Sequence, residues 1–238
     1  MSETLSEATR QKFLGVSTAT LTSCLFKRGF RNLWMQNVHP VNPRLRMCGP
    51  AFTLRTIPSR EDLDAMSGYA NPEHPQRKAI ETCPAGHVMV TDSRGDARAA
   101  SGGDILLTRL MIRGCAGAVT DGGFRDTPSI QKIEFPVYHA RPSAPTAPIL
   151  HCSIDIGLPI GCGGVPVYPG DIIVGDGEGV IVVPKHLADE VAEEAFEMTV
   201  YEDFVEEKVR EGRRLPGLYP ASDASREEFK VWRKAQGR

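Results

Sequence analysis

Residues 121–130, DGGFRDTPSI, bring together side chains that could bind an anion and a metal ion. They follow the apolar run CAGAVT and present Arg125 and Asp126 side by side after two glycines. The guanidinium of an arginine is a planar fork of donors that suits an oxyanion. Mg²⁺ commonly takes only one or two protein carboxylates and keeps several waters, so Asp126 could hold it. The stretch therefore indicates a site for a small anionic substrate that chelates a hard metal ion, where a forming enolate could be stabilised.

A glycine pair about twenty residues upstream could complete this site. Gly102 and Gly103 come just before residues 104–114, DILLTRLMIRG, whose apolar spacing predicts a helix that stops at Gly114. A helix begins with unpaired backbone N–H groups and a partial positive charge, which suit a carboxylate or a phosphate. Glycine lets such an anion approach the backbone closely. We therefore expect the loop at residues 102–106 to bind an anion.

Two buried strands must position these groups. Residues 86–93, GHVMVTDS, and residues 115–120, CAGAVT, flank the predicted helix and read as strands, the second of them fully buried. A strand, a helix and a strand in this order form a βαβ unit with parallel strands. The carboxyl ends of parallel strands meet at one edge of a sheet, where ligands collect. We therefore expect Arg125 and Asp126 to face the glycine loop across one rim.

Further elements are predicted on both sides of this unit. Two helices open the chain, the second with Ser17 as its N-cap. A strand follows at residues 49–58, and then a polar, proline-interrupted segment at 59–83, helical at both ends, that we interpret as a lid or an interface element able to shape specificity. From Pro136 the chain turns to β structure, and a last helix from about residue 185 to 210 precedes a polar tail.

The pattern as a whole predicts an α/β protein with a compact β/β/α fold, a central βαβ unit, and helical N- and C-terminal segments. With 238 residues, 41% of them hydrophobic and 24% charged, the chain can bury a sizeable core, and we expect one domain over residues 1–238. Its expected parts are a helical segment at 1–45, the β/β/α core at 46–184, and the C-terminal helix and tail at 185–238.

Charge and composition narrow the function classes. A formal net charge of −2 and the scattered Lys and Arg residues give no case for a nucleic-acid partner. No apolar run reaches the length of a membrane span, and the N-terminus lacks the apolar segment of a secretory signal, so we expect no membrane partner and a cytoplasmic location. The six cysteines lie far apart without a CxxC pair, which favours buried free thiols over a zinc site.

A plainer interpretation of the rim stays open at this point. An adjacent Arg125 and Asp126 after glycines can be a surface ion pair of negligible energy, and Asp104 can merely favour the first turn of its helix. Other chemistry has less support. No serine or cysteine stands in an elbow motif, no histidines have metal-ligand spacing, and no GxGxxG or GxxxxGK[ST] loop is present.

The stretch SGGDILLTRLMIRGCAGAVTDGGFRD resembles the signature of the family that contains regulator of ribonuclease activity A and the 4-hydroxy-4-methyl-2-oxoglutarate/4-carboxy-4-hydroxy-2-oxoadipate aldolases. The later stretch PVYPGDIIVGDGEGVIVVP is similar to a second region of that family. The aldolases are metal-dependent class II pyruvate aldolases. The resemblance implies a β/β/α fold assembled into homotrimers or homohexamers, with active sites at the subunit interfaces.

The resemblance also implies a role for each matching residue. Asp126 is the carboxylate that binds Mg²⁺ or, alternatively, Mn²⁺, and Arg125 contacts the substrate and supports the enolate. The pyruvate carboxylate is held by the backbone of the loop formed by Gly103, Asp104, Ile105 and Leu106.

Two further positions follow from the same resemblance. In the aldolases a glutamate from the neighbouring subunit's C-terminal helix reaches the site; Glu202 is its nearest match, with Glu206 and Glu207 as rivals. The aldolase motif continues RD-x-x-Glu/Asp, whereas Ser129 stands at that position here and offers the surroundings of the metal no carboxylate. This departure affects transfer of the specific aldol substrate more than transfer of the metal–pyruvate core.

The leading hypothesis is therefore a divalent-metal-dependent lyase that cleaves a 4-hydroxy-2-oxo acid to pyruvate, decarboxylates oxaloacetate through the same enolate, or does both. The alternative is a non-catalytic protein that binds and inhibits a ribonuclease. A swivelling phosphohistidine carrier would need a histidine in residues 102–106, which contain none. A methyltransferase would need a glycine-rich nucleotide loop after an N-terminal strand, and the chain lacks one.

Overall fold

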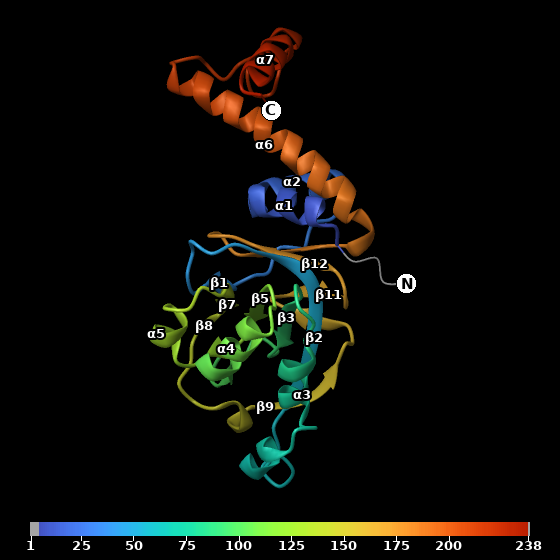
Figure 1. Cartoon of the computed structure of the whole chain (residues 1–238), viewed down its shortest axis with the longest axis vertical. Coiled ribbons are helices and arrows are strands. Elements are labelled where there is room, and N and C mark those ends of the chain that lie inside the picture. The colour runs from blue at the N-terminus through green and yellow to red at the C-terminus, as the bar shows by residue number, and fades with distance from the viewer. Residues whose placement is uncertain (1–4, 238) are drawn as a thin grey trace.

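The computed structural model describes residues 5–237, and within them an eight-stranded mixed sheet forms the centre of the molecule (Figure 1). Its strands are β1 (His39–Pro40), β2 (Met47–Pro58), β3 (Val88–Asp92), β5 (Gly117–Thr120), β7 (Val137–His139), β9 (His151–Ile156), β12 (Ile172–Gly175) and β13 (Val180–Val183). β7, β5, β3 and β2 pair in parallel in that order, whereas β1, β9, β12 and β13 add antiparallel partners. The predicted α/β class is confirmed.

The predicted βαβ unit is present as β3, α4 (Asp104–Ile112) and β5. β3 and β5 pair in parallel, from Val88 opposite Gly117 to Thr91 opposite Thr120. All of β5 and all but the last residue of β3 are buried, as expected for strands covered on both faces. The helix stops before Gly114, whose φ of +79° suits the left-handed residue that follows many helices.

A separate three-stranded parallel sheet carries the two loops of the predicted rim. It consists of β4 (Ala100–Gly102), β6 (Gly123–Phe124) and β8 (Arg141–Pro142). β4, β6 and β8 were not predicted from the sequence. β6 pairs with β4, and the left-handed bend comes only at Asp126. Strands of two or three residues are too short to show an alternating pattern in the sequence.

Helices cover the central sheet on two sides (Figure 1). Besides α4 they are α1 (Glu7–Gly15), α2 (Thr18–Lys27), α3 (Pro75–Thr82), α5 (Thr127–Ile130), α6 (Ala188–Arg210) and α7 (Asp223–Ala235). α1, α2 and α6 pack over β12 and β13 around Phe13, Leu21 and Val191. α3 and α4 pack over the parallel strands around Ile80 and Leu107. The sheet is thus the middle layer, and the rim lies on the side of α4.

A third apolar cluster fills the inside of the curved sheet. It includes Met47, Val90, Tyr138 and Ile173, and the hairpin of β10 (Ile160–Cys162) and β11 (Val165–Val167) packs against the same cluster. At the N-terminus, the predicted N-cap Ser17 accepts a hydrogen bond from the N–H of Thr20 at 3.0 Å. The cluster thus packs against both strands of the βαβ unit, and the cap marks the start of α2.

The C-terminal region differs from the expected polar tail. After the 3₁₀ helix η3 (Lys185–Leu187) and α6, the chain forms α7, which packs on the far end of α6 (Figure 1). Phe204, Phe229 and Trp232 pack together there, and the indole N–H of Trp232 donates to Glu207 at 2.9 Å. The sequence prediction failed because α7 is mostly polar and buries only a narrow apolar stripe.

The segment at 59–83 is only partly helical. Its C-terminal part forms α3 as predicted, whereas its N-terminal part consists of turns before the 3₁₀ helix η1 (Met66–Ala70). A second 3₁₀ helix, η2 (Ala147–Ile149), precedes β9.

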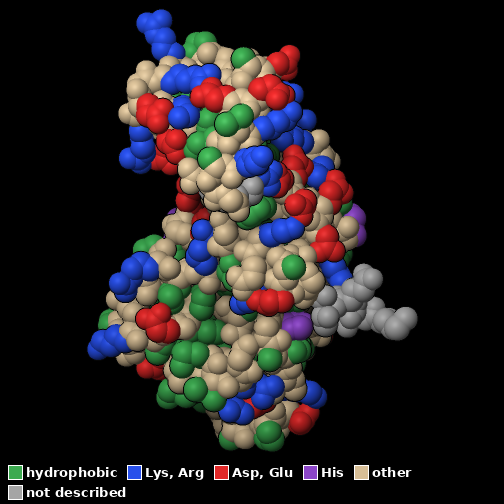
Figure 2. Space-filling view, turned by 45° about the horizontal axis from the view of Figure 1, so that its top comes forward, with side chains coloured by type: hydrophobic (Ala, Val, Ile, Leu, Met, Phe, Trp, Pro, Cys, Tyr) green, Lys and Arg blue, Asp and Glu red, His purple; other side chains and the backbone are tan. Residues whose placement is uncertain are grey.

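None of the helices in residues 5–237 is both long and apolar enough to cross a membrane. Figure 2 shows acidic and basic side chains intermixed over the helical end, with hydrophobic side chains gathered nearer the sheet.

Candidate active site

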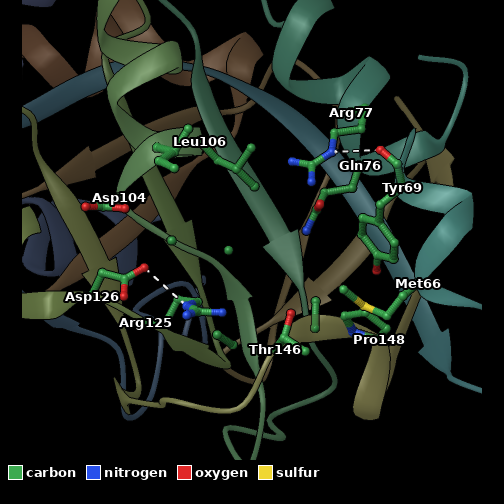
Figure 3. A pocket seen from close by; sticks show the side chains of 15 residues that line it. Met66, Tyr69, Gln76, Arg77, Asp104, Leu106, Arg125, Asp126, Thr146 and Pro148 are labelled. Atoms are coloured by element: carbon green, nitrogen blue, oxygen red, sulfur yellow. Dashed lines mark hydrogen bonds and ion pairs between the residues drawn. The ribbon is translucent and has the colours of Figure 1, made fainter. Parts of the chain in front are cut away.

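The glycine loop and the Arg–Asp pair line one cavity of about 350 Å³, as the βαβ topology predicted (Figure 3). One wall is formed by residues from the ends of β4 and β6 and the start of α4, and the opposite wall by η1, α3 and η2. The lining residues on the first wall are Ala100, Gly102, Gly103, Asp104, Ile105, Leu106, Arg125 and Asp126. The structure therefore brings together every predicted site residue except Glu202.

Gly103 allows a close approach between the two loops. A Cβ atom at this position would lie 2.6 Å from Oδ2 of Asp126 and 2.8 Å from Cγ of Arg125, closer than real Cβ contacts occur. Its φ of −140° is extended backbone that any residue can adopt, so the requirement for glycine is steric. The backbone N–H of Arg125 also donates to the carbonyl of Gly102 at 3.0 Å. The loop of Gly103 and the loop of Arg125 and Asp126 are consequently held in a fixed relative position.

Asp126 adopts a left-handed backbone conformation, with φ of 61° and ψ of 31°. This region disfavours residues with a Cβ, although Asp and Asn are found there more often than others. The backbone carbonyl of Asp126 accepts hydrogen bonds from the N–H groups of Ser129 and Ile130 and so starts α5. Strain of this kind gathers at functional sites. The bend makes Asp126 a candidate functional residue.

Arg125 and Asp126 form an ion pair that water can reach. Nε of Arg125 lies 3.2 Å from Oδ2 of Asp126, and the two side chains are 45% and 37% exposed. An exposed pair contributes little to the free energy of unfolding. A ligand could therefore separate the pair with little loss of unfolding free energy. The position of the pair in the cavity argues against the plain surface-pair interpretation.

The start of α4 supplies backbone donors to the same cavity. Gly103 is its N-cap and has no side chain to accept hydrogen bonds from the first turn. The N–H groups of Asp104, Ile105 and Leu106 have no acceptor within the helix, because α-helical bonds begin one turn later. They carry the positive end of the helix dipole. A carboxylate bound here would receive donors from the backbone and from Arg125.

Buried polar groups support the rim from behind, and the sequence reasoning missed them. The hydroxyls of Ser93, Ser101 and Thr120 hydrogen-bond to one another at 2.7, 2.8 and 3.0 Å. The carboxylate of Asp121 accepts the N–H groups of Ser93 at 2.7 Å, of Gly95 at 2.9 Å and of Gly163 at 3.3 Å. Burial raises the pKa of Asp121, and these N–H donors oppose the rise. The signal in the sequence was the polar end of each apolar strand, TDS and VTD.

His139 fixes the residue before the Arg–Asp pair. Its Nδ1 accepts a hydrogen bond from the backbone N–H of Phe124 at 3.3 Å. An imidazole can accept at this nitrogen only while it is unprotonated there. Burial lowers the pKa of His139 to about 4, so the ring is neutral at pH 7. His139 is therefore a positioning residue, which the sequence analysis had not singled out.

The opposite wall contributes residues that the sequence had not singled out as site residues. Met66 and Tyr69 come from η1, Gln76 and Arg77 from α3, and Thr146 precedes η2 (Figure 3). The amide of Gln76 donates to the carbonyl of Ser101 at 2.7 Å and so ties α3 to β4. Met66, Tyr69, Gln76 and Arg77 belong to the segment at 59–83 that was predicted as a lid or an interface element, whereas Thr146 lies outside it. These residues were not connected with Arg125 and Asp126 in the sequence analysis because they lie far from them in the sequence.

The oxygen donors on the first wall suit a hard divalent cation. Asp104 and Asp126 lie on the same wall (Figure 3). Across residues 5–237 no three or more His, Cys, Asp or Glu side chains gather in a group that could hold a metal ion. Mg²⁺ fits such a sparse donor set, because it commonly binds through one or two carboxylates, substrate oxygens and waters. Zinc, which prefers three or four nitrogen or sulfur ligands, does not fit.

The C-terminal glutamates lie elsewhere in the chain. Glu202 lines a groove between α6 and α7, where Oε2 is 3.4 Å from the hydroxyl of Thr20 and Oε1 is 3.5 Å from that of Tyr219. Glu206 pairs with Arg210, and Glu207 accepts from Trp232. None of the three lines the cavity of Arg125. The prediction that one of them enters a neighbouring subunit's site stays a prediction.

Comparisons with known proteins show the family of the chain. A family model described as "RraA-like: Aldolase/RraA" matches residues 5–182. A Halalkalibacterium halodurans protein, whose provisional name is 4-hydroxy-4-methyl-2-oxoglutarate aldolase, is 33% identical over 184 residues, covering 77% of this chain and 80% of that protein.

Two solved structures share the fold. An uncharacterised Pseudomonas syringae pv. tomato protein superimposes with a TM-score of 0.78 at 24% identity, covering 91% of this chain and 98% of that chain. Streptomyces coelicolor RraAS2, described as an unusual member of the RNase ES inhibitor RraA protein family, gives a TM-score of 0.74 at 27% identity, covering 86% and 98%. On the breadth of the family match, the chain belongs to the RraA-like (Aldolase/RraA) family.

Proposed function

We propose that the protein is a divalent-metal-dependent lyase that releases pyruvate from a 2-oxo acid. Its reactions would be retro-aldol cleavage of a 4-hydroxy-2-oxo acid, decarboxylation of oxaloacetate, or both. The observation that carries the proposal is the meeting of three groups in one cavity: the first amides of α4, Arg125, and the strained Asp126. The provisional aldolase name of the Halalkalibacterium relative supports it.

The residues of this chain divide the work. The N–H groups at the start of α4 bind the C1 carboxylate of the substrate and set its orientation. Breaking the C3–C4 bond leaves an electron pair on C3 that spreads to the C2 oxygen, and Arg125 donates hydrogen bonds to that oxygen as its charge grows. A divalent cation, Mg²⁺ or Mn²⁺, would be held by Asp126 and would supply Lewis-acid stabilisation of the same charge. Protonation at C3 then yields pyruvate.

The fate of C4 separates the two reactions. In the retro-aldol reaction the 4-hydroxyl gives its proton to water or to a nearby carboxylate, C4 becomes a carbonyl and the second product is a ketone or aldehyde. With oxaloacetate, C4 leaves as carbon dioxide. We also propose, from the family resemblance, that Glu202 of a neighbouring copy completes the site in a homotrimer or homohexamer. The cytoplasm is the location that suits such an enzyme of 2-oxo acid metabolism.

The first experiment measures pyruvate release with lactate dehydrogenase coupling. Oxaloacetate and 4-hydroxy-4-methyl-2-oxoglutarate would each be tested with Mg²⁺, with Mn²⁺ and with EDTA. We expect release above the free-metal background that stops with EDTA and resumes when the metal is restored. Enzyme-dependent release that persists in EDTA would contradict the metal-dependent mechanism. No release from either substrate under any condition would contradict the lyase.

A second candidate function has one specific observation in its favour. The Streptomyces coelicolor relative is described as belonging to a family of ribonuclease inhibitors, and the fold is shared. Under this alternative the protein binds a ribonuclease and does no chemistry. Dose-dependent inhibition of a degradosome-type ribonuclease by the metal-free protein, together with no pyruvate release, would favour the regulator over the lyase.

A further inference from the structure

Two arginines face the cavity from opposite walls, but they differ in how their charge is balanced (Figure 3). Arg125 is paired with Asp126 at 3.2 Å. For Arg77, on α3, no carboxylate among residues 5–237 lies within ion-pair distance. Both acidic residues of the cavity, Asp104 and Asp126, belong to the wall of Arg125. The cavity therefore has an uncompensated positive charge at one end.

Two arginines near Arg77 differ from it, because each has a carboxylate within ion-pair distance. Arg109, on α4, donates to both carboxylate oxygens of Glu81 at 2.8 to 3.2 Å. Arg113 lies 3.8 Å from the same carboxylate. Glu81 is on α3, as Arg77 is, but its carboxylate pairs with Arg109 and Arg113. Arg77 is left for a partner that comes from outside the chain.

The side chain of Arg77 is held in a position that suits such a partner. Its Nε donates to the backbone carbonyl of Tyr69 at 3.4 Å, and its guanidinium carbon lies 5.5 Å from the centre of the Tyr69 ring. One N–H and one face of the guanidinium are thereby used. The terminal N–H groups remain and point toward the cavity (Figure 3). A stacked guanidinium of this kind is well prepared to bind a carboxylate through two parallel hydrogen bonds.

The distribution of charge along the cavity indicates the chemistry of the partner. In the proposed function, the amides at the start of α4 and Arg125 bind the pyruvyl end of the substrate. The remaining wall offers Arg77, the hydroxyl of Thr146 and the apolar surface of Met66 and Tyr69, but no carboxylate. A substrate that ends in a neutral group would leave a half-buried guanidinium without a counter-charge. A second carboxylate at the far end of the substrate would neutralise it.

We propose that Arg77 binds this second carboxylate, so that the cavity selects 2-oxo dicarboxylates over 2-oxo monocarboxylates. The inference rests on the proposed function, because it takes the pyruvyl end to lie at Arg125. It assigns Arg77 a role in specificity and none in breaking the C3–C4 bond.

Binding measurements test the inference without relying on turnover. Pyruvate and 2-oxoglutarate share the pyruvyl end, and 2-oxoglutarate adds a second carboxylate but has no 4-hydroxyl, so it cannot undergo retro-aldol cleavage. We would titrate both, with Mg²⁺ present, into the wild type, Arg77→Gln and Arg77→Lys. The matched control is Arg98→Gln, which removes the same charge from a side chain that is 71% exposed, paired with Asp96, and outside the cavity.

We expect Arg77→Gln to weaken binding of 2-oxoglutarate roughly 10- to 100-fold, the range of a lost charge-assisted hydrogen-bond pair, and binding of pyruvate by less than about threefold. Arg77→Lys keeps the charge without the fork, so it should fall between the two. The control should bind both ligands like the wild type. Equal losses for the two ligands, or no loss for 2-oxoglutarate, would overturn the inference. Thermal unfolding of each variant checks that α3 is intact.

Turnover then separates this inference from the proposed function. With an active wild type, Arg77→Gln should lower the ratio of kcat/KM for 4-hydroxy-4-methyl-2-oxoglutarate to kcat/KM for 4-hydroxy-2-oxopentanoate, a monocarboxylate, by roughly 10-fold or more. An unchanged ratio would contradict the role of Arg77 while the lyase stands. A wild type that prefers 2-oxoglutarate over pyruvate but cleaves nothing would contradict the lyase and leave the binding role of Arg77 intact.

Discussion

The two walls of the cavity are held in place in different ways. The wall of Arg125 and Asp126 is supported by buried strands, and glycines bring backbone and side chains into close contact: a Cβ at Gly103 would lie 2.6 Å from Asp126. The wall of η1 and α3 is more open, with Met66 62% exposed and nothing within 4 Å of a Cβ placed on Gly68. The groups that we propose to react therefore lie on the closely packed wall, and the residue that we propose to set specificity lies on the more open one.

The largest expected effect comes from removing the reacting groups of the first wall. Arg125→Ala and Asp126→Ala should each lower kcat/KM for pyruvate release by roughly 10³-fold, because each removes stabilisation of charge that develops in the transition state. The free energy of unfolding should change by less than about 1 kcal/mol, since the pair is exposed. Steady-state kinetics and urea unfolding check the two parts. Variants that fail to fold, or that react normally, would remove these residues from the proposed mechanism.

The next effect isolates the close packing of that wall. Gly103→Ala should push Asp126 and Arg125 away from the loop and lower kcat/KM by roughly 10- to 100-fold, because small displacements of reacting groups are costly. Gly68→Ala is the matched control on the opposite wall, where a Cβ meets open space, and should stay within about twofold. Similar effects of the two substitutions would contradict the contrast between the walls.

The same contrast explains what the sequence could predict. The rim followed from local features, since a glycine pair, a helix and two apolar runs in order require Gly103 and Arg125 to meet. Arg77 lies in the cavity on α3, which Gln76 ties to β4 through Ser101, a contact across 25 residues that no spacing rule contains. α7 was missed for a related reason, because its few apolar residues pack on Phe204 of another helix. Local pattern thus predicted the groups that we propose to react, whereas the wall that we propose to set specificity depends on tertiary packing.

A third effect concerns stability and pH. The folded state lowers the pKa of His139 to about 4, below the ordinary value of 6.5, so the unfolded chain takes up a proton first as the pH falls. The stabilisation from the neutral ring is complete above pH 6.5 and is lost as the pH falls toward 4. Acidification from pH 7 to pH 5 should therefore lower the free energy of unfolding by about 2 kcal/mol through His139.

The measurement for His139 is urea unfolding at pH 7 and pH 5 of the wild type and of His139→Asn. The substituted amide keeps an acceptor for the N–H of Phe124 but does not titrate, so the variant should lose less stability on acidification. Burial also lowers the pKa of His74, the N-cap of α3, but His74 is less buried than His139, and its ring accepts the N–H of Gln76 at the start of that helix. His74→Asn should therefore change the pH dependence less. A larger effect of His74→Asn than of His139→Asn would contradict the assignment of the pH-sensitive contact to His139.

The smallest effect belongs to the open wall. Met66→Ala shortens a side chain that lines the cavity from η1 but is already 62% exposed, so little apolar area is lost. Its urea midpoint should stay close to that of the wild type, and kcat/KM should change by less than about threefold. A fall of more than 10-fold would mean that η1 is as tightly organised around the substrate as the rim is. Both walls would then be equally preorganised around the substrate. The two walls would differ only in charge, because Arg77 has no carboxylate partner among residues 5–237 and Arg125 has one.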